Sequence, residues 1–215
     1  MANDDIPTIG EAMLERPRVD FERGMSFLPP VSILLCLACT GVFAWQLSTG
    51  ALASEDAIIR AGALNGPRVA AGEYWRMITA VFLHGSPDHL IGNLVVLFIL
   101  GMACEHAYGS LRYVPLYLLA GLGGSALSLV NGHTSVGASG AIFGLAGALV
   151  AFFTKYRREY LLRDLRVGSV LLVWAIYQVA LGFMNPMIDN LAHIGGFVSG
   201  LLIGVVLRKR PREEL

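Results

Sequence analysis

Six long apolar runs, separated by short polar segments, constrain the fold of this chain of 215 residues more than any other feature. They cover about 31–52, 90–108, 113–130, 137–153, 167–184 and 190–207. A helix of roughly 20 apolar residues crosses a hydrocarbon core about 30 Å thick. Each run is too long for a barrel strand, and a helix satisfies its own backbone groups in lipid. We therefore predict an all-α, polytopic membrane protein built as a bundle of six transmembrane helices.

The composition excludes an ordinary soluble domain, because 55% of the residues are hydrophobic and only 15% are charged. Lys and Arg together number 16, as do Asp and Glu, so the net charge indicates no nucleic-acid partner. Cys36 and Cys39 have the spacing of a redox pair, but no βαβ pattern surrounds them, which favours a role in helix packing. The chain has no HExxH pattern, and His84, His89 and His193 have no carboxylate at ligand spacing. We predict neither a metal site nor a cofactor.

Positive charge marks one side of the predicted bundle. Lys155, Arg157 and Arg158 lie between the fourth and fifth runs, and Arg-Lys-Arg at 208–210 follows the sixth. The positive-inside rule places these segments, and with them both termini, in the cytoplasm. The first thirty residues have no apolar core of the kind that a signal peptide has. We predict a short cytoplasmic tail (1–29), a membrane domain (30–207) and a basic cytoplasmic tail (208–215), in a bacterial inner membrane.

The long outer connection, residues 53–88, is too apolar for a flexible linker. It contains Tyr74-Trp75-Arg76 followed by an apolar run at 77–83. Tyr and Trp favour the level of the lipid headgroups. We expect this connection to lie partly in the outer membrane interface.

Polar residues with catalytic potential enter three of the runs from the same, outer side. His89 and Asn93 lie at the start of the second run, Ser139 at the start of the fourth and His193 at the start of the sixth. Polar groups inside a membrane are candidates for function. From Ser139 to the basic residue Lys155 a helix rises about 24 Å, less than the ~30 Å core. Ser139 would therefore lie below the outer surface, in a water-filled pocket open to that side.

Each of these residues also has a structural interpretation. Small residues in the fourth and sixth runs, among them Gly140 and Gly196, are typical of close helix packing. The two interpretations are compatible, because such packing would bring His193 within hydrogen-bond reach of Ser139. Phe143, four residues after Ser139, could stack on the imidazole or simply fill the core.

The remaining polar residues also have both a functional and a structural interpretation. His89 and Asn93, four apart on one helical face, could be oxyanion donors or a structural hydrogen-bonding pair. Asp189 could orient His193 or act as an anion at a helix N-terminus. We favour a Ser–His dyad without a carboxylate, and we expect His84 to hold a loop.

Together these residues resemble the rhomboid intramembrane serine proteases. The matching pieces are Trp75-Arg76 in the outer connection, His84-x4-His89-x3-Asn93, Gly137-Ala138-Ser139-Gly140, and Ala192-His193-x2-Gly196-x3-Gly200. The resemblance extends over about 31–207. Phe143 is a small departure, because tyrosine is common at this position in the family.

The resemblance implies an enzyme that cleaves a peptide bond in or next to the transmembrane helix of a substrate protein. Ser139 would be the nucleophile, His193 the general base and then acid, and His89, Asn93 and the Ser139 N–H the oxyanion site. Gly137, Gly140, Phe143, Gly196, His84, Trp75 and Arg76 would support them. Partners would be single-span or polytopic membrane proteins and the lipid bilayer. The alternative is a non-catalytic rhomboid-like protein that binds or chaperones transmembrane helices.

Overall fold

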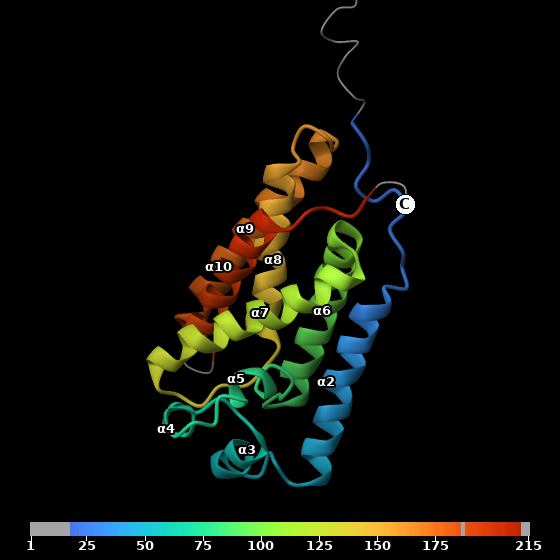
Figure 1. Cartoon of the computed structure of the whole chain (residues 1–215). Helices are drawn as coiled ribbons and strands as arrows, with labels where there is room; N and C mark the ends of the chain where they lie inside the picture. The colour runs from blue at the N-terminus through green and yellow to red at the C-terminus, as the bar shows by residue number, and fades with distance from the viewer. Residues whose placement is uncertain (1–17, 186–187, 212–215) are drawn as a thin grey trace, which may run out of the picture.

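The computed structural model describes residues 18–185 and 188–211, and in this part of the chain the predicted all-α fold is confirmed (Figure 1). The long helices are α2 (Pro30–Ser48), α6 (Pro87–Tyr108), α7 (Ser110–Ser128), α8 (Ser139–Lys155), α9 (Leu162–Gly182) and α10 (Asn190–Val206). The connection between α2 and α6 carries the short helices α3 (Glu55–Ala61), α4 (Gly66–Ala70) and α5 (Arg76–Thr79), and the 3-10 turn η1 (Leu129–Asn131) follows α7. Two isolated β-bridges, Val19 with Tyr160 and Leu64 with Ser135, occur without a sheet in the described residues.

Three segments of the described chain are long and apolar enough to cross a membrane: Pro30–Ser48, Pro87–Tyr108 and Ser110–Asn131. Helices α8 and α10 are apolar but shorter, at 17 residues each, and the apolar part of α9 is Arg166–Gly182. A helix of 17 residues rises about 25 Å, which is a few ångströms less than the ~30 Å hydrocarbon core. The count of six transmembrane helices stays a prediction.

The helix boundaries differ from the predicted runs where capping residues decide them. The first helix ends at Ser48 rather than near residue 52, because the chain turns through Gly50, which has a φ of 69°. The second helix begins at Pro87, three residues before the predicted start. There Ser86 caps it by accepting a hydrogen bond of 3.2 Å from the backbone N–H of His89. Proline at the first helical position loses no hydrogen bond, so this start is favoured.

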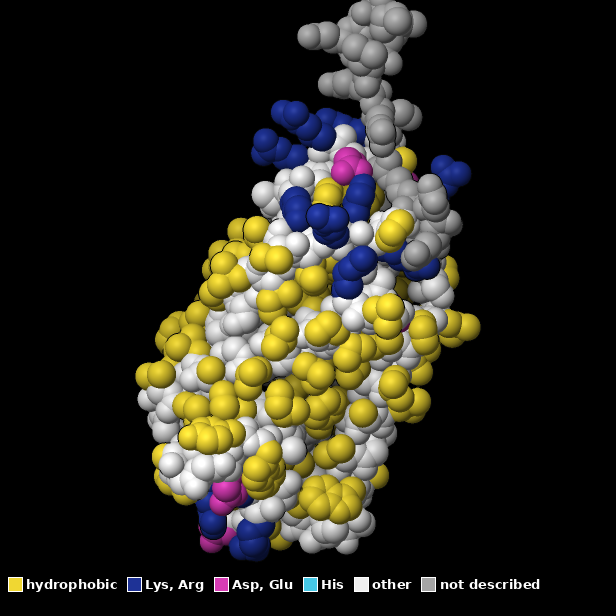
Figure 2. Space-filling view, viewed as in Figure 1, with side chains coloured by type: hydrophobic (Ala, Val, Ile, Leu, Met, Phe, Trp, Pro, Cys, Tyr) yellow, Lys and Arg dark blue, Asp and Glu magenta, His cyan; other side chains and the backbone are white. Residues whose placement is uncertain are grey.

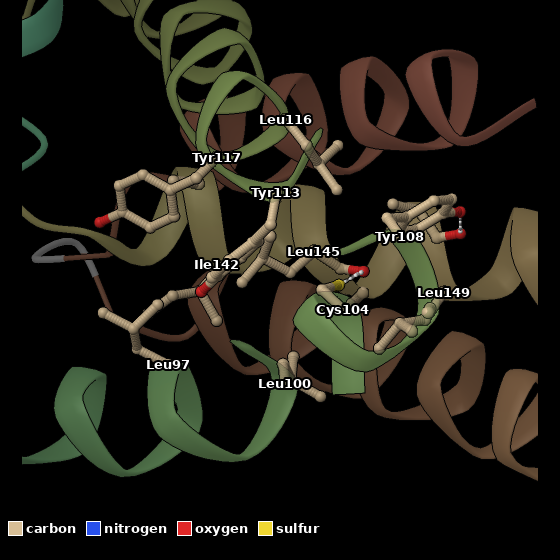
Figure 3. Packing of buried hydrophobic residues seen from close by; sticks show 14 of the residues in the cluster. Leu97, Leu100, Cys104, Tyr108, Tyr113, Leu116, Tyr117, Ile142, Leu145 and Leu149 are labelled. Carbon is tan, nitrogen blue, oxygen red and sulfur yellow. Dashed lines mark hydrogen bonds between the residues drawn. The ribbon is translucent and has the colours of Figure 1, made fainter. Parts of the chain in front are cut away.

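Helix α8 is the centre of the bundle and packs against α6, α7, α9 and α10. All but one of its residues from Gly140 to Phe153 are buried. On its α6 and α7 side lies a core of large apolar and aromatic side chains (Figure 3). Within that core the Tyr108 hydroxyl donates to the Ala148 carbonyl over 2.7 Å, and the Cys104 thiol lies 3.5 Å from the Leu145 carbonyl. These contacts join α6 to α8 and hold the serine-bearing helix in place.

The two ends of the bundle differ. The connection with α3, α4 and α5 covers one end, which we call the loop end, and both described chain ends lie at the other (Figure 1). Lys and Arg side chains gather at this second end, which we call the basic end, while apolar side chains cover the body of the bundle (Figure 2). Ser139 is the first residue of α8 and His193 lies in the first turn of α10, both toward the loop end.

The part of the predicted N-terminal tail that the structure describes, residues 18–29, packs on the basic end; residues 1–17 lie outside the described chain. Phe21 is 6% exposed and lies edge-on against Phe152, Phe153 and Tyr160. Val19 exchanges backbone hydrogen bonds of 2.9 and 3.0 Å with the connection between α8 and α9. This segment is therefore part of the folded unit.

Candidate active site

Ser139 is the first residue of α8, at the point where an irregular segment enters the bundle. Two residues earlier, Gly137 has a φ of 129°, a conformation that favours glycine. Its N–H donates to the Ala80 carbonyl over 2.9 Å, and Ser135 and Leu64 exchange two backbone hydrogen bonds of 3.0 Å. The segment before Ser139 is thereby fixed against the loop end.

The Ser139 hydroxyl lies 3.0 Å from Nε2 of His193, although 54 residues separate them in the chain. His193 is 8% exposed. When Nε2 carries no proton, this geometry lets the serine O–H donate to it, as a nucleophile does to its base. The Phe143 ring lies parallel to the imidazole, with centroids 4.1 Å apart and planes 7° apart. The orientation of the imidazole is therefore restricted by α8 as well as by its own helix.

Glycines allow α8 and α10 to approach closely enough for this contact. A Cβ on Gly196 would lie 1.9 Å from the carbonyl oxygen of Gly140, and a Cβ on Gly200 would lie 1.9 Å from that of Gly144. No side chain larger than hydrogen fits at either position without a shift of backbone. The separation of the two helices, and with it the Ser139–His193 distance, is set by backbone contact.

His89 and Asn93 both face Gly137, beside the start of α8. The Cε1 and Nε2 atoms of His89 would lie 2.6 and 2.9 Å from a Cβ on Gly137, and Nδ2 of Asn93 would lie 3.5 Å from it. Nδ2 of Asn93 is buried and has no hydrogen-bond partner within the described residues. A buried donor without a partner costs free energy, so this amide is suited to bind the oxygen of a ligand.

Asp189 has the geometry of a helix cap. Its Oδ1 accepts a hydrogen bond of 3.0 Å from the Ala192 N–H, and its Oδ2 accepts one from the Ser128 hydroxyl. Nδ1 of His193 is buried and has no hydrogen-bond partner in residues 18–185 and 188–211. The arrangement therefore matches a Ser–His pair without a carboxylate on the imidazole.

A cavity of about 960 Å³ joins these residues. Ser139, His193, His89 and Asn93 all line it, together with residues of α9 and of the segment before α8. Gly137, Gly140 and Phe143 also line it, whereas His84, Trp75, Arg76 and Gly196 do not. The cavity can hold several residues of an extended peptide and the water that hydrolysis needs.

Trp75 and Arg76 lie in the loop end, away from the reacting groups. Arg76 is 4% exposed, its Nε donates to Glu73 over 2.7 Å, and its Nη1 donates to the carbonyls of Ala63 (3.2 Å) and Ile59. The guanidinium lies 4.5 Å from the centre of the Trp75 ring. The pKa of Glu73 is lowered, mainly because its carboxylate accepts the hydrogen bond from Arg76. Arg76 thereby links α5 to the end of α3 and to the segment that precedes α4.

One residue of the site's surroundings was not identified from the sequence. Gln46 of α2 is fully buried and hydrogen-bonded to the backbone of His84. The available signal was the single amide side chain in the mainly apolar run 31–48. His84 itself lies edge-on to His89, with ring centroids 5.3 Å apart.

No group of three or more His, Cys, Asp or Glu side chains that could hold a metal ion occurs in the described chain. Hydroxyl, imidazole and amide groups around a cavity instead suit acyl transfer, because they supply a nucleophile, its base and donors for an oxyanion.

Comparison with known proteins identifies the family. A sequence profile of the rhomboid domain matches residues 71–210, which include Ser139, His193, His89, Asn93 and Gly137. The chain belongs to the rhomboid family. Its members are integral membrane proteins, and the activity typical of the family is proteolysis of transmembrane substrates within the bilayer.

The relatives include one that is named as a protease and one that is named as inactive. The chain is 38% identical over 155 residues to RHOMBOID-like protein 5 of Arabidopsis thaliana, which covers 70% of this chain and 50% of the relative. It is 37% identical over 159 residues to the rhomboid protease GluP of Bacillus subtilis (74% and 31%). It is also 36% identical over 144 residues to Inactive RHOMBOID-like protein 8 of A. thaliana (65% and 40%). The chain spans half or less of the length of these relatives.

Proposed function

We propose that this chain is an intramembrane serine endopeptidase that cleaves membrane proteins in or next to a transmembrane helix. Ser139 is the nucleophile of the proposal, and His193 is its general base. The observation that carries the proposal is the 3.0 Å contact between the Ser139 hydroxyl and Nε2 of His193 in a cavity of about 960 Å³. Membership of the rhomboid family supports it independently.

In the first half of the proposed reaction, the Ser139 oxygen attacks the carbonyl carbon of the scissile amide while its proton moves to Nε2 of His193. The carbonyl π-electrons move to the oxygen and give a tetrahedral oxyanion. His193 then passes the proton to the amide nitrogen, the C–N bond breaks, and the amine product leaves. Ser139 retains the acyl group as an ester.

The second half hydrolyses the ester. Water from the cavity attacks the ester carbonyl and gives its proton to Nε2 of His193. The C–O bond to Ser139 then breaks, and the proton returns to the serine oxygen. The carboxylic acid product leaves, and both residues regain their starting protonation states.

The oxyanion would accept hydrogen bonds from His89, Asn93 and the Ser139 N–H. Three features support this role: both side chains face Gly137, the Asn93 amide is buried without a partner, and the Ser139 N–H belongs to the first turn of α8, which points its donors out of the helix. Loss of one such donor typically costs about 10²–10³ in kcat.

The proposed topology has six transmembrane helices and both termini in the cytoplasm. Lys and Arg are concentrated at the basic end, where they include Lys155, Arg157 and Arg158, whereas the loop end carries few, among them Arg68 and Arg76. The positive-inside rule then makes the loop end extracytoplasmic, and the cavity opens to that side of a bacterial cell membrane.

Labelling with a serine-directed fluorophosphonate, combined with cleavage of a transmembrane substrate in liposomes, tests the proposal. The unmodified protein should label and cleave, and Ser139→Ala should abolish both. His193→Ala should lower both by at least about 10³-fold, because the serine then lacks its base. Ser110→Ala, which alters a hydroxyl at the basic end, is the control that keeps both activities. Labelling that survives His193→Ala would exclude the assigned dyad.

The alternative is a non-catalytic protein that binds transmembrane helices, and one of the relatives is named as inactive. It predicts client binding without labelling or cleavage, and binding that Ser139→Ala does not change. Labelling at Ser139 together with cleavage rejects it.

A further inference from the structure

Gln46 is a buried amide in α2, a helix that contributes no residue to the lining of the cavity. Its Nε2 donates to the carbonyl oxygen of His84 over 3.0 Å, and its Oε1 accepts from the N–H of His84, also over 3.0 Å. Both polar ends of the amide are thus used on one residue of the loop end. Such a two-point contact fixes both the position and the orientation of the His84 peptide groups.

The His84 side chain connects this contact to His89 in the site. Its Nδ1 lies 3.2 Å from the Phe82 carbonyl, which can only accept, so Nδ1 holds the proton of the neutral ring. Burial lowers the pKa of His84 to about 4, and the ring is neutral at neutral pH. The ring is fully buried and meets the His89 ring edge-on, at 5.3 Å and an interplanar angle of 64°.

The His89 ring is in turn enclosed. His84 lies on one side, and Gly137 lies so close that a Cβ there would be 2.6 Å from Cε1 of His89. The backbone of His89 is held by the Ser86 cap. Movement of His84 would therefore release a side chain that restricts the His89 ring.

We infer that Gln46 is a positioning residue, which acts through His84 to hold the His89 side chain where it donates to the oxyanion. This inference rests on the proposed serine-protease function. The competing explanation is that Gln46 only satisfies buried backbone groups, which stabilises the fold and leaves the chemistry unchanged.

Two substitutions separate these explanations. Gln46→Leu keeps the approximate volume and removes both hydrogen bonds. Gln46→Glu keeps both when the new carboxyl is protonated, and loses the donor when it is ionised. Because only the ionised carboxylate loses the hydrogen bond to the His84 carbonyl, a change of pH compares the two states within one protein. Ser32→Ala is the matched control, because it removes a buried hydrogen bond to Glu105 at the other end of the same helix.

The measurement is kcat and KM per fluorophosphonate-labelled site in liposomes, so that misfolded protein does not count. For Gln46→Leu we expect kcat to fall at least about tenfold with KM within about threefold, because a misplaced catalytic group can cost about 10². For Gln46→Glu, kcat relative to the unmodified protein should fall as the pH is raised from about 6 to about 8.5. Ser32→Ala should lower the unfolding temperature and leave kcat per labelled site unchanged.

Each result has one interpretation. A Gln46→Leu protein with kcat per site within twofold of the unmodified protein overturns the inference and leaves the proposed function standing. If Gln46→Leu does not fold, a pH-independent kcat ratio for Gln46→Glu overturns it instead. An unmodified protein that neither labels nor cleaves refutes the proposed function, and the inference with it.

Discussion

The backbone of Gly196 in α10 lies against the backbone of Gly140 in α8, with the Gly140 oxygen only 1.9 Å from where a Cβ of residue 196 would be. Gly140 directly follows Ser139, and Gly196 lies three residues after His193. Because no side chain lies between the helices here, the structure has no flexible group that could absorb a larger residue. The packing of two glycines thus determines a distance between two other residues.

The first prediction concerns Gly196→Ala. The added methyl must push α10 away from α8, and overpacking of this kind costs about 1–3 kcal/mol. Cleavage and fluorophosphonate labelling should both fall at least about tenfold, because the serine and its base separate. The control is Gly41→Ala, since a Cβ there meets nothing within 4 Å. Unchanged labelling in Gly196→Ala would contradict the role of this contact.

The second prediction concerns the ring that covers His193. Phe143→Leu removes the stacked ring, and such pairs contribute about 0.5–1.5 kcal/mol beyond their buried area. We expect kcat to fall roughly two- to tenfold, whereas Phe143→Tyr should stay near the level of the unmodified protein. Single-turnover cleavage at saturating substrate measures this step. Equal rates for the leucine and tyrosine variants would show that the ring does not orient the imidazole.

The third prediction concerns the guanidinium at the loop end. Arg76→Lys cannot reach Glu73, Ala63 and Ile59 together, and the lost charged hydrogen bonds should lower the free energy of unfolding by about 2–3 kcal/mol. Arg68→Lys is the control, because Arg68 also pairs with Glu73 but its side chain is 55% exposed. That change should be nearly neutral. Thermal unfolding in detergent compares the two, and similar losses would contradict the assignment.

The fourth prediction concerns pH. In the folded protein the pKa of His84 is about 4, because burial disfavours its charged form, whereas an unfolded His titrates near 6.5. The unfolded chain therefore binds more protons between these values. The contribution of His84 to stability is complete above about pH 6.5 and is lost as the pH falls toward 4. The unfolding temperature of the unmodified protein should fall further over this window than that of His84→Gln, by on the order of 5 °C.

If the unfolding temperatures of the unmodified protein and of His84→Gln fall equally over this window, the pKa of His84 is not lowered in the folded protein. The same experiment on Arg68→Lys controls for general effects of pH on the detergent complex, since that substitution changes no group that titrates in this window.

The apolar runs and short motifs of the sequence predict the fold class and the family of this protein. The all-α fold and the rhomboid family were predicted from these features, and both are confirmed. The six-span topology and the roles of the site residues stay predictions. The sequence also left Asp189 with two interpretations, and the structure shows it as the cap of α10, bound to the Ala192 N–H.

The sequence by itself determined which long segments are helical and that Ser139 and His193 lie in the first turns of their helices, because in lipid a long apolar run must satisfy its backbone internally. Only the tertiary structure decided that Gly196 meets Gly140 and that Gln46 binds His84. Such contacts depend on how separate helices rotate and approach, and side chains far apart in the chain fix that geometry together, with no periodic trace in any one segment.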